Sequence, residues 1–322
     1  WQLGMARGGV EVKAFFRDKM AVAFIFGLPS ILLVLLGSIF GSQAAAQGVT
    51  VGQLFTAGMI AGGLMSTSFQ YLAIAIATER ENGMLKRLSG TPMPRPAYFA
   101  GKFVQVTVCA VAETALLIAV GMLFYHLRLP TGPSKWWTFA WVFLLGTAAC
   151  SLLGIAASSV PRSAASATPV ITLPFTVLNF ISGVYVPFNV VPAWMRVIAS
   201  FFPLKWMAQG MRSVFLPEQA QTLEPAGSWE HGLTALVLVA WMAAGLVLCV
   251  KTFRWQSRGR CPISRGRPPG SWPSRGGTFT TRWSSPPAWP SWRRRRRTRP
   301  SGSSPPPPWP RWRRGTCSSA VR

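Results

Sequence analysis

Residues suited to catalysis or to metal binding are scarce in this chain. The two histidines, His126 and His231, each fall at the end of an apolar stretch, and the five cysteines are scattered without a CxxC spacing. The phosphate-binding pattern GxxxxGK(S/T), the nucleophile pattern GxSxG and the zinc pattern HExxH are all missing from the sequence. The sequence therefore predicts no catalytic residue, no metal site and no bound cofactor.

The densest group of charges lies in residues 79–102 (ERENGMLKRLSGTPMPRPAYFAGK). Its first part carries both signs of charge, on Glu79, Arg80, Glu81, Lys86 and Arg87. Gly83 divides these charges and predicts a turn or a break in a helix. Pro92, Pro94 and Pro96 predict an extended connection after it. Composition alone leaves two interpretations open: a solvated loop, or a docking element that exposes both signs of charge.

Two polar side chains lie inside apolar stretches, where they are costly unless a partner or a cavity receives them. Glu113 is the only acid well inside such a stretch. It either contacts a cationic substrate or a second chain, or it is a structural group paired near Gln105, and we favour the structural role. Asn179 is a weaker candidate for a translocation or interface position, because a hydrogen bond between helices is the simpler expectation.

Apolar blocks of roughly 20 residues must position these groups, and that length spans a bilayer core. Half of the 322 residues are hydrophobic and only 13% are charged, which argues against a soluble globular protein. We predict an all-α integral membrane protein with six transmembrane helices. The predicted spans are about 20–41, 53–77, 103–125, 136–158, 164–186 and 231–252.

The segments around the spans predict how the chain sits in a membrane. Residues 1–19 mix charges with apolar side chains and predict an interfacial helix on the membrane surface. Residues 58–63 (GMIAGG) bring small residues to one face of the second span, which favours close helix contact. Lys and Arg number twelve in the segments on the N-terminal side of the membrane and five on the other side, which favours both termini in the cytoplasm.

Residues 187–229 are too interrupted by proline for a span and too apolar for a free loop. We predict a re-entrant helical hairpin, two short helices flanking Pro203 that dip into the outer leaflet before the sixth span. Such backbone must be buried in protein or line a cavity. The alternative is an interfacial helix anchored by tryptophans. The residues expected at this outer mouth are Pro187, Pro192, Trp194, Pro203 and Arg212.

Residues 257–322 differ in composition from the rest of the chain. From residue 258 onward they hold 16 Arg and no acidic residue, together with many Pro, Ser and Gly. Such a tail cannot bury a core, so we expect it to be disordered. We favour a frameshifted read of GC-rich DNA as its origin. The alternatives are a basic tail that binds anionic lipid and a nucleic-acid-binding tail, although we expect no nucleic-acid partner.

Three motifs follow one another along the six spans. Residues 79–92 fit the pattern ERE-x-G-x-LKRL-x-x-TP, and residues 181–195 fit SG-x-x-x-P-x-x-x-x-P-x-W. Residues 201–215 are similar to a PL-x-x-x-x-x-x-R region, with seven rather than six residues between Leu204 and Arg212. In these motifs, and in FRW at 253–255, the chain resembles the permease subunits of type-2 ABC exporters, especially the bacterial daunorubicin and multidrug-resistance branch. The resemblance covers roughly residues 3–256 and gives the tail no role.

The resemblance implies an elbow helix at 1–19 and a permease domain at 20–256. It implies a homodimer or heterodimer of permeases in the bacterial cell membrane, with separate ABC ATPase subunits that hydrolyse ATP. The transported substrate would be a drug-like or lipid-like amphiphile. The residues implied in the cytoplasmic gate and in coupling to the ATPase are Glu79, Arg80, Glu81, Gly83, Lys86 and Arg87.

Two other classes of membrane protein compete with an exporter permease. An ion-coupled secondary transporter often shows repeats and several buried acids, whereas this sequence has one buried acid and no recognisable repeat. A membrane protein without transport activity would not need a charged docking segment after its second span. We therefore expect a transport permease rather than an enzyme.

Overall fold

The computed structural model describes residues 2–40, 44–46, 49–90, 94–186, 188, 190–224 and 226–252. Within these ranges six helices are long and apolar enough to cross a membrane, which confirms the all-α membrane class and the number of spans. These helices are Lys19–Phe40, Val51–Glu81, Pro96–Tyr125, Pro133–Ala157, Ala164–Ile181 and His231–Thr252. The prediction of a disordered tail falls outside the described residues.

Two of the long helices are built from several pieces. The first joins α2 (Lys19–Val22), a π-helical turn (Ala23–Gly27) and α3 (Leu28–Phe40), and the second joins α4 (Val51–Met65), a π-helical turn (Ser66–Tyr71) and α5 (Leu72–Glu81). The other long helices are α7 (Arg95–Tyr125), α8 (Pro133–Ala157), α9 (Ala164–Ile181) and α12 (His231–Thr252). The shorter elements are α1 (Gln2–Arg17), β1 (Ala44–Ala46), β2 (Val49–Thr50), α6 (Met84–Ser89), α10 (Ala193–Phe201), α11 (Pro203–Phe215) and a 3₁₀ turn (Glu218–Leu223).

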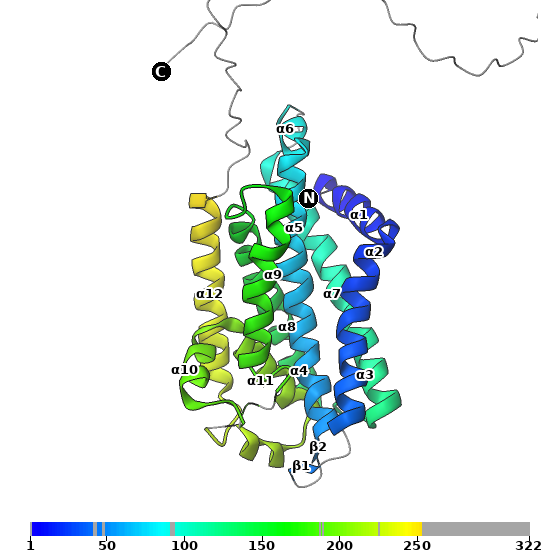
Figure 1. Ribbon diagram of the computed structural model, residues 1–322, viewed down its shortest axis with the longest axis vertical. Helices are drawn as coiled ribbons and strands as arrows, with labels where there is room; N and C mark the ends of the chain where they lie inside the picture. The colour runs from blue at the N-terminus through cyan, green and yellow to red at the C-terminus, as the bar shows by residue number, and fades with distance from the viewer. Residues whose placement is uncertain are drawn as a thin grey trace, which may run out of the picture. The chain divides into compact units, whose positions relative to one another are not determined.

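The elements at the two ends of the helix bundle differ (Figure 1). One end carries α1, α6 and the last turn of α12, and we call it the α6 end. The other end carries α10 and the short antiparallel pair of β1 and β2, and we call it the β1 end. An even number of spans brings both ends of the described chain to the same side, and the structure agrees with this.

A π-helical turn precedes Pro29 in the first span. Proline donates no backbone hydrogen bond, so Pro29 leaves the carbonyl of Ile25, one turn earlier, without its usual α-helical partner. Ile25 lies inside the wide turn at Ala23–Gly27, where the α-helical bonding pattern is already changed. Helices inside a bilayer tolerate proline where such local adjustments occur.

Helix α4 is buried along almost its whole length and packs against α7 and α11. A Cβ added at Gly58 would lie 3.3 Å from the Val184 carbonyl oxygen, and one added at Gly62 would lie 2.8 Å from Asn179 Oδ1. A larger side chain would push these neighbours away. The close helix contact predicted for residues 58–63 is therefore confirmed.

The connection before the third span differs from the prediction. Pro96 was expected in an extended connection, and this is wrong, because α7 already begins at Arg95 with Pro94 as its N-cap. Proline is well tolerated in the first turn of a helix, where its missing N–H has no partner to lose. At the end of the fifth span, α9 stops at Ile181 rather than near 186, and Gly183 follows with a φ of 81°.

The two short helices predicted on either side of Pro203 are present as α10 and α11. Pro192 is the N-cap of α10, and Pro203 occupies the first turn of α11. All residues of α11 are buried, and the helix packs against α4, α8 and α12. Pro187, which was predicted at the outer mouth, lies outside the described residues.

Candidate functional site

A buried cluster of charges at the α6 end joins three helices. Lys102 of α7 donates through Nζ to Glu11 Oε2 of α1 at 3.0 Å and to Glu79 Oε1 of α5. Tyr98 of α7 donates its hydroxyl to Glu79 Oε2 at 2.8 Å, and Arg7 donates to Glu11 Oε1 at 2.5 Å. We call Arg7, Glu11, Glu79, Tyr98 and Lys102 the charged junction. Lys102 is 2% exposed, and its two carboxylate partners offset the cost of burying its ammonium group.

The two residues after Glu79 contact another part of the molecule. Arg80 donates through Nη2 to the Pro161 carbonyl at 3.1 Å, in the connection between α8 and α9. Glu81 accepts a hydrogen bond from the Ala164 N–H at the first residue of α9. A carboxylate at a helix N-terminus is favourable because it satisfies an unpaired N–H and faces the positive end of the helix dipole. Three consecutive side chains thus tie the end of α5 to α7, to the connection between α8 and α9 and to the start of α9, while α1 is joined to this group through Lys102.

Helix α6 follows this triplet after a sharp turn. Gly83 has a φ of 71°, a left-handed conformation that favours glycine, and it separates α5 from α6. The predicted break at Gly83 is therefore confirmed. Leu85 of α6 is buried in a small apolar cluster with Leu72 and Ile76 of α5, which anchors the short helix.

Two exposed charges at this end, Lys86 and Arg87, belong to α6. Glu79 and Arg80 are half-buried against their neighbours, and Glu81 is exposed although it accepts the Ala164 N–H. Figure 1 shows α6 beyond the ends of the neighbouring helices. The charged residues singled out in the sequence thus fall into a group before Gly83, whose three side chains bond to other parts of the bundle, and a group after it on α6.

Sequence reasoning missed the residues that complete the charged junction. Glu11 was grouped with a surface helix, and Lys102 was counted as one more cation of a loop. Their partners are 91 and 23 residues away along the chain, so no local pattern links them. The nearest sequence signal is a pair of glycines, Gly4 and Gly8, on the same face of α1 as Glu11. A Cβ at Gly8 would lie 2.7 Å from Val104 Cβ, which shows how closely α1 packs on α7.

Glu113 is buried in the middle of the bundle beside α4. The Thr67 hydroxyl donates to Glu113 Oε2, and Glu113 Oε1 has no hydrogen-bond partner among the described residues. Gly63 leaves space for the carboxyl group, since a Cβ there would lie 2.7 Å from Oε1. The expectation that Gln105 is close is wrong, because eight residues along one helix separate the two by about 12 Å. Gln105 instead donates to the Tyr71 hydroxyl at 3.2 Å.

Asn179 is buried on α9 and faces α4. Its Nδ2 donates to the Phe175 carbonyl of its own helix at 2.9 Å, and its Oδ1 has no partner among the described residues. Its packing against Gly62 makes it a contact residue between α9 and α4. A direct side-chain hydrogen bond between helices, which was the expectation, is not present within the described residues.

A second buried ion pair lies at the β1 end. Arg212 of α11 donates through Nε to Glu224 Oε1 at 2.7 Å and through Nη1 to the Gly183 carbonyl at 3.2 Å. This arginine therefore holds together α11, the segment after α9 and the segment before α12. Nearby, burial lowers the pKa of Lys205, while the carboxylates of Glu224 and Glu230 raise it. Trp194, in contrast, is 62% exposed on α10.

Groups that could hold a metal ion are not found in the described part of the chain, where no three His, Cys, Asp or Glu residues come together suitably. The described cysteines, Cys109, Cys150 and Cys249, are buried and unpaired. The polar side chains of this molecule instead connect helices to one another. A bundle of six apolar helices with such contacts at its ends defines a multi-pass membrane protein.

Comparison with known proteins gives the family. The sequence profile described as ABC-2 type transporter matches residues 9–216, and the chain belongs to this family. Two similar proteins come from Mycobacterium tuberculosis, strains CDC 1551 and H37Rv, and each is named a probable doxorubicin resistance ABC transporter permease protein, DrrC. Each is 23% identical over 197 residues, which cover 61% of this chain and 70% of the relative. The resemblance to type-2 ABC permeases of the drug-resistance branch is confirmed.

Proposed function

We propose that this chain is the transmembrane subunit of an ATP-driven exporter, and that α6 is its contact with a separate ATPase subunit. Membership of the ABC-2 family makes the chain a permease component of an ABC transporter. Energy in such a system comes from a different polypeptide, and this sequence has no phosphate-binding loop of its own. The two ATPases and a second permease chain would complete the assembly.

The observation that carries this proposal is the contrast between α5 and α6. The charges before Gly83 bond to α7, to the connection between α8 and α9 and to the start of α9, and the exposed charges of α6 extend beyond these elements. A force applied to α6 would reach α5 through the Leu85 contact, and then α7 and α9 through Glu79, Arg80 and Glu81. Such a contact can drive transport only if it differs between two states of the molecule.

The proposed orientation puts the α6 end in the cytoplasm. The excess of Lys and Arg in the segments on this side supports it. Both termini of the permease domain would then be cytoplasmic, and α1 would lie along the inner membrane surface. The helices α10 and α11 would form the outer mouth, with α11 re-entering the outer leaflet. Its complete burial among α4, α8 and α12 supports this, because polar backbone in a bilayer must be covered by protein.

We propose a drug-like or lipid-like amphiphile as the substrate. The naming of two relatives for doxorubicin resistance supports the drug-like choice. The spans offer mainly apolar side chains, which suit a hydrophobic molecule that enters from the membrane. Glu113 is proposed as a structural group rather than a substrate ligand, since Thr67 already donates to it.

The test is a transport assay with the double variant Glu79→Ala/Glu81→Ala. The full chain is expressed with its ATPase partner, and ATP-dependent uptake of doxorubicin is measured in inverted membrane vesicles. Removing both carboxylates disconnects α5 from α7 and α9, so we expect weaker ATPase docking and loss of substrate-stimulated ATPase activity. Lys13→Ala, an exposed charge on α1, is the matched control and should leave both unchanged. Normal stimulation in the double variant would refute the coupling role.

A further inference from the structure

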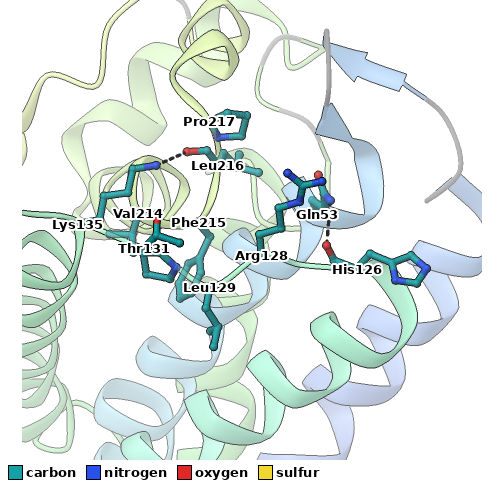
Figure 2. Close-up of a pocket in the computed structure, with 11 residues that line it drawn as sticks. Gln53, His126, Arg128, Leu129, Thr131, Lys135, Val214, Phe215, Leu216 and Pro217 are labelled. Atoms are coloured by element: carbon teal, nitrogen blue, oxygen red, sulfur yellow. Dashed lines mark hydrogen bonds between the residues drawn. The ribbon is translucent and has the colours of Figure 1, made fainter. Parts of the chain in front are cut away.

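A pocket of about 530 Å³ lies at the β1 end, away from the charged junction. The connection between α7 and α8 forms one side of it, and the last residues of α11 form the other (Figure 2). Gln53 from the start of α4 also lines the pocket and donates to the His126 carbonyl at 3.4 Å. Neither the coupling region nor the buried carboxyl of Glu113 contributes to it.

The polar lining of this pocket is cationic. Arg128 and Lys135 both reach into the pocket region, and no described residue of the lining is acidic. Lys135 Nζ donates to the Leu216 carbonyl at 3.1 Å, which leaves its other two protons available. The Arg128 guanidinium has no hydrogen-bond or ion-pair partner within the described ranges. Glu218 follows Pro217 along the chain, but it is not part of the lining.

The neighbouring span ends and tryptophans indicate that the pocket lies at the level of a membrane–water interface. Helix α7 ends at Tyr125, and α8 begins at Pro133, so the pocket lies where two spans turn back. Trp137 of α8 is 73% exposed, and Trp136 donates through Nε1 to the Pro130 carbonyl at 2.8 Å. Tryptophans of this kind gather at the level of lipid headgroups. The unpaired arginine therefore lies at the depth of the phosphate groups of a bilayer.

An apolar groove begins beside the cationic pocket. It has a volume of about 410 Å³ and runs between α7 and α8, with Ile118, Ala140 and Phe143 among its lining residues. Trp136 lines this groove, and its neighbour Lys135 lines the pocket. The two features thus offer a cationic head site and an apolar channel next to each other on adjoining turns of the chain.

We propose that the pocket binds the phosphate of an anionic membrane phospholipid and that the groove between α7 and α8 holds one of its acyl chains. Arg128 presents a planar pair of N–H groups suited to two phosphate oxygens, and Lys135 adds a second positive charge. A zwitterionic lipid carries its own cation, which these residues would repel. A free phosphate ion would satisfy the cations but leave the groove unused. This inference concerns the membrane-embedded chain and does not depend on the proposed coupling role of α6.

The experiment compares lipid retention by native mass spectrometry. The purified full chain is equilibrated in detergent with equal amounts of phosphatidylglycerol and phosphatidylcholine, and the bound lipids are counted. Arg128→Gln is the main variant, because within the described residues Arg128 makes no hydrogen bond or ion pair that its loss would break. Arg128→Gln/Lys135→Gln removes both charges. Arg196→Gln on α10 is the matched control, since it removes one cation near the same end and faces a different pocket.

We expect the unmodified chain and Arg196→Gln to retain phosphatidylglycerol in preference to phosphatidylcholine. The loss of one interfacial cation should reduce this preference about fivefold, and the double variant should abolish it. Equal retention of the two lipids by the unmodified chain would overturn the proposal, as would unchanged preference in the double variant. An equal rise in melting temperature with inorganic phosphate and with phosphatidylglycerol would also overturn it, because the groove would then contribute nothing.

Discussion

Lys102 is the residue that depends most on the rest of the molecule. It is almost fully buried, and its two carboxylate partners come from α1 and α5. Burying an ammonium group is costly, and only good pairing offsets the cost. This arrangement adds little net stability, but it makes the positions of three helices depend on one another. Removing one carboxylate therefore alters the pairing of Lys102 with the other.

The variant Lys102→Met tests the charged junction. It leaves Glu11 and Glu79 facing each other without the shared cation, and breaking a buried pair in this way typically costs about 3 kcal/mol or more. We expect a clear fall in the melting temperature of the purified protein. Lys13→Met on the exposed face of α1 is the same chemical change and should have almost no effect. Equal melting temperatures for the two variants would show that the pairing of Lys102 in the charged junction does not contribute to the stability of the protein.

Two variants of Glu113 distinguish the effect of its charge from the effect of its hydrogen bond with Thr67. Glu113→Gln keeps an oxygen that accepts from Thr67, whereas Glu113→Leu removes it. We expect export to be unchanged in Glu113→Gln, and we expect Glu113→Leu to lose about 1 kcal/mol of stability, as for other hydrogen bonds between helices. Drug export by cells and thermal unfolding are the measurements. Abolished export in the glutamine variant would mean that transport needs the charge.

For single residues, the sequence predicted which side chains are important better than it predicted the residues that they contact. Glu79, Arg80 and Glu81 stand out as a charged triplet, yet each contacts a residue 19 to 83 positions away, which no local pattern reveals. Glu224 and Arg212 are only 12 residues apart, but their pairing depends on how α11 packs. The type of each residue can be read from the sequence, but its partner is set by how distant parts of the chain pack together.

The elements were more predictable than the residues. Apolar length alone predicts six spans, and Pro203 predicts the division between α10 and α11. Pro96 was misjudged because a proline can open a helix as well as prevent one. The π-helical turn at Ser66–Tyr71 was not predictable, since nothing in its sequence, STSFQY, breaks a helix. It lies beside the Thr67–Glu113 contact, and such turns occur often at functional positions.

The contact between α1 and α7 is tested by two neighbouring glycines. Alanine at either position raises helix propensity by up to about 1 kcal/mol. A Cβ at Gly9 meets nothing within 4 Å, whereas one at Gly8 lies 2.7 Å from Val104 Cβ. We therefore expect Gly9→Ala to raise the melting temperature slightly and Gly8→Ala to lower it, a difference of about 2 kcal/mol for overpacking. Equal shifts for both variants would contradict the close packing of α1.

For the molecule as a whole, the two ends of the bundle carry different polar features. The α6 end holds the charged junction and the exposed charges of α6, and the β1 end holds the Arg212–Glu224 pair and the cationic pocket. Membership of the ABC-2 family places the chain in an assembly with ATPases in general. The proposed surface for them is α6. The proposed mechanism requires that end to be cytoplasmic.

The most direct test is a site-specific cross-link between α6 and the ATPase. Arg87→Cys and Ser134→Cys put a reactive thiol on exposed positions at the α6 end and at the β1 end. Each full-length variant is expressed with its ATPase partner in native membranes and treated with a short bifunctional maleimide, and the unmodified chain gives the background. The account predicts a cross-linked permease–ATPase product from position 87 and none above background from position 134. A product from position 134, or none from position 87 while the ATPase still co-purifies, would contradict it.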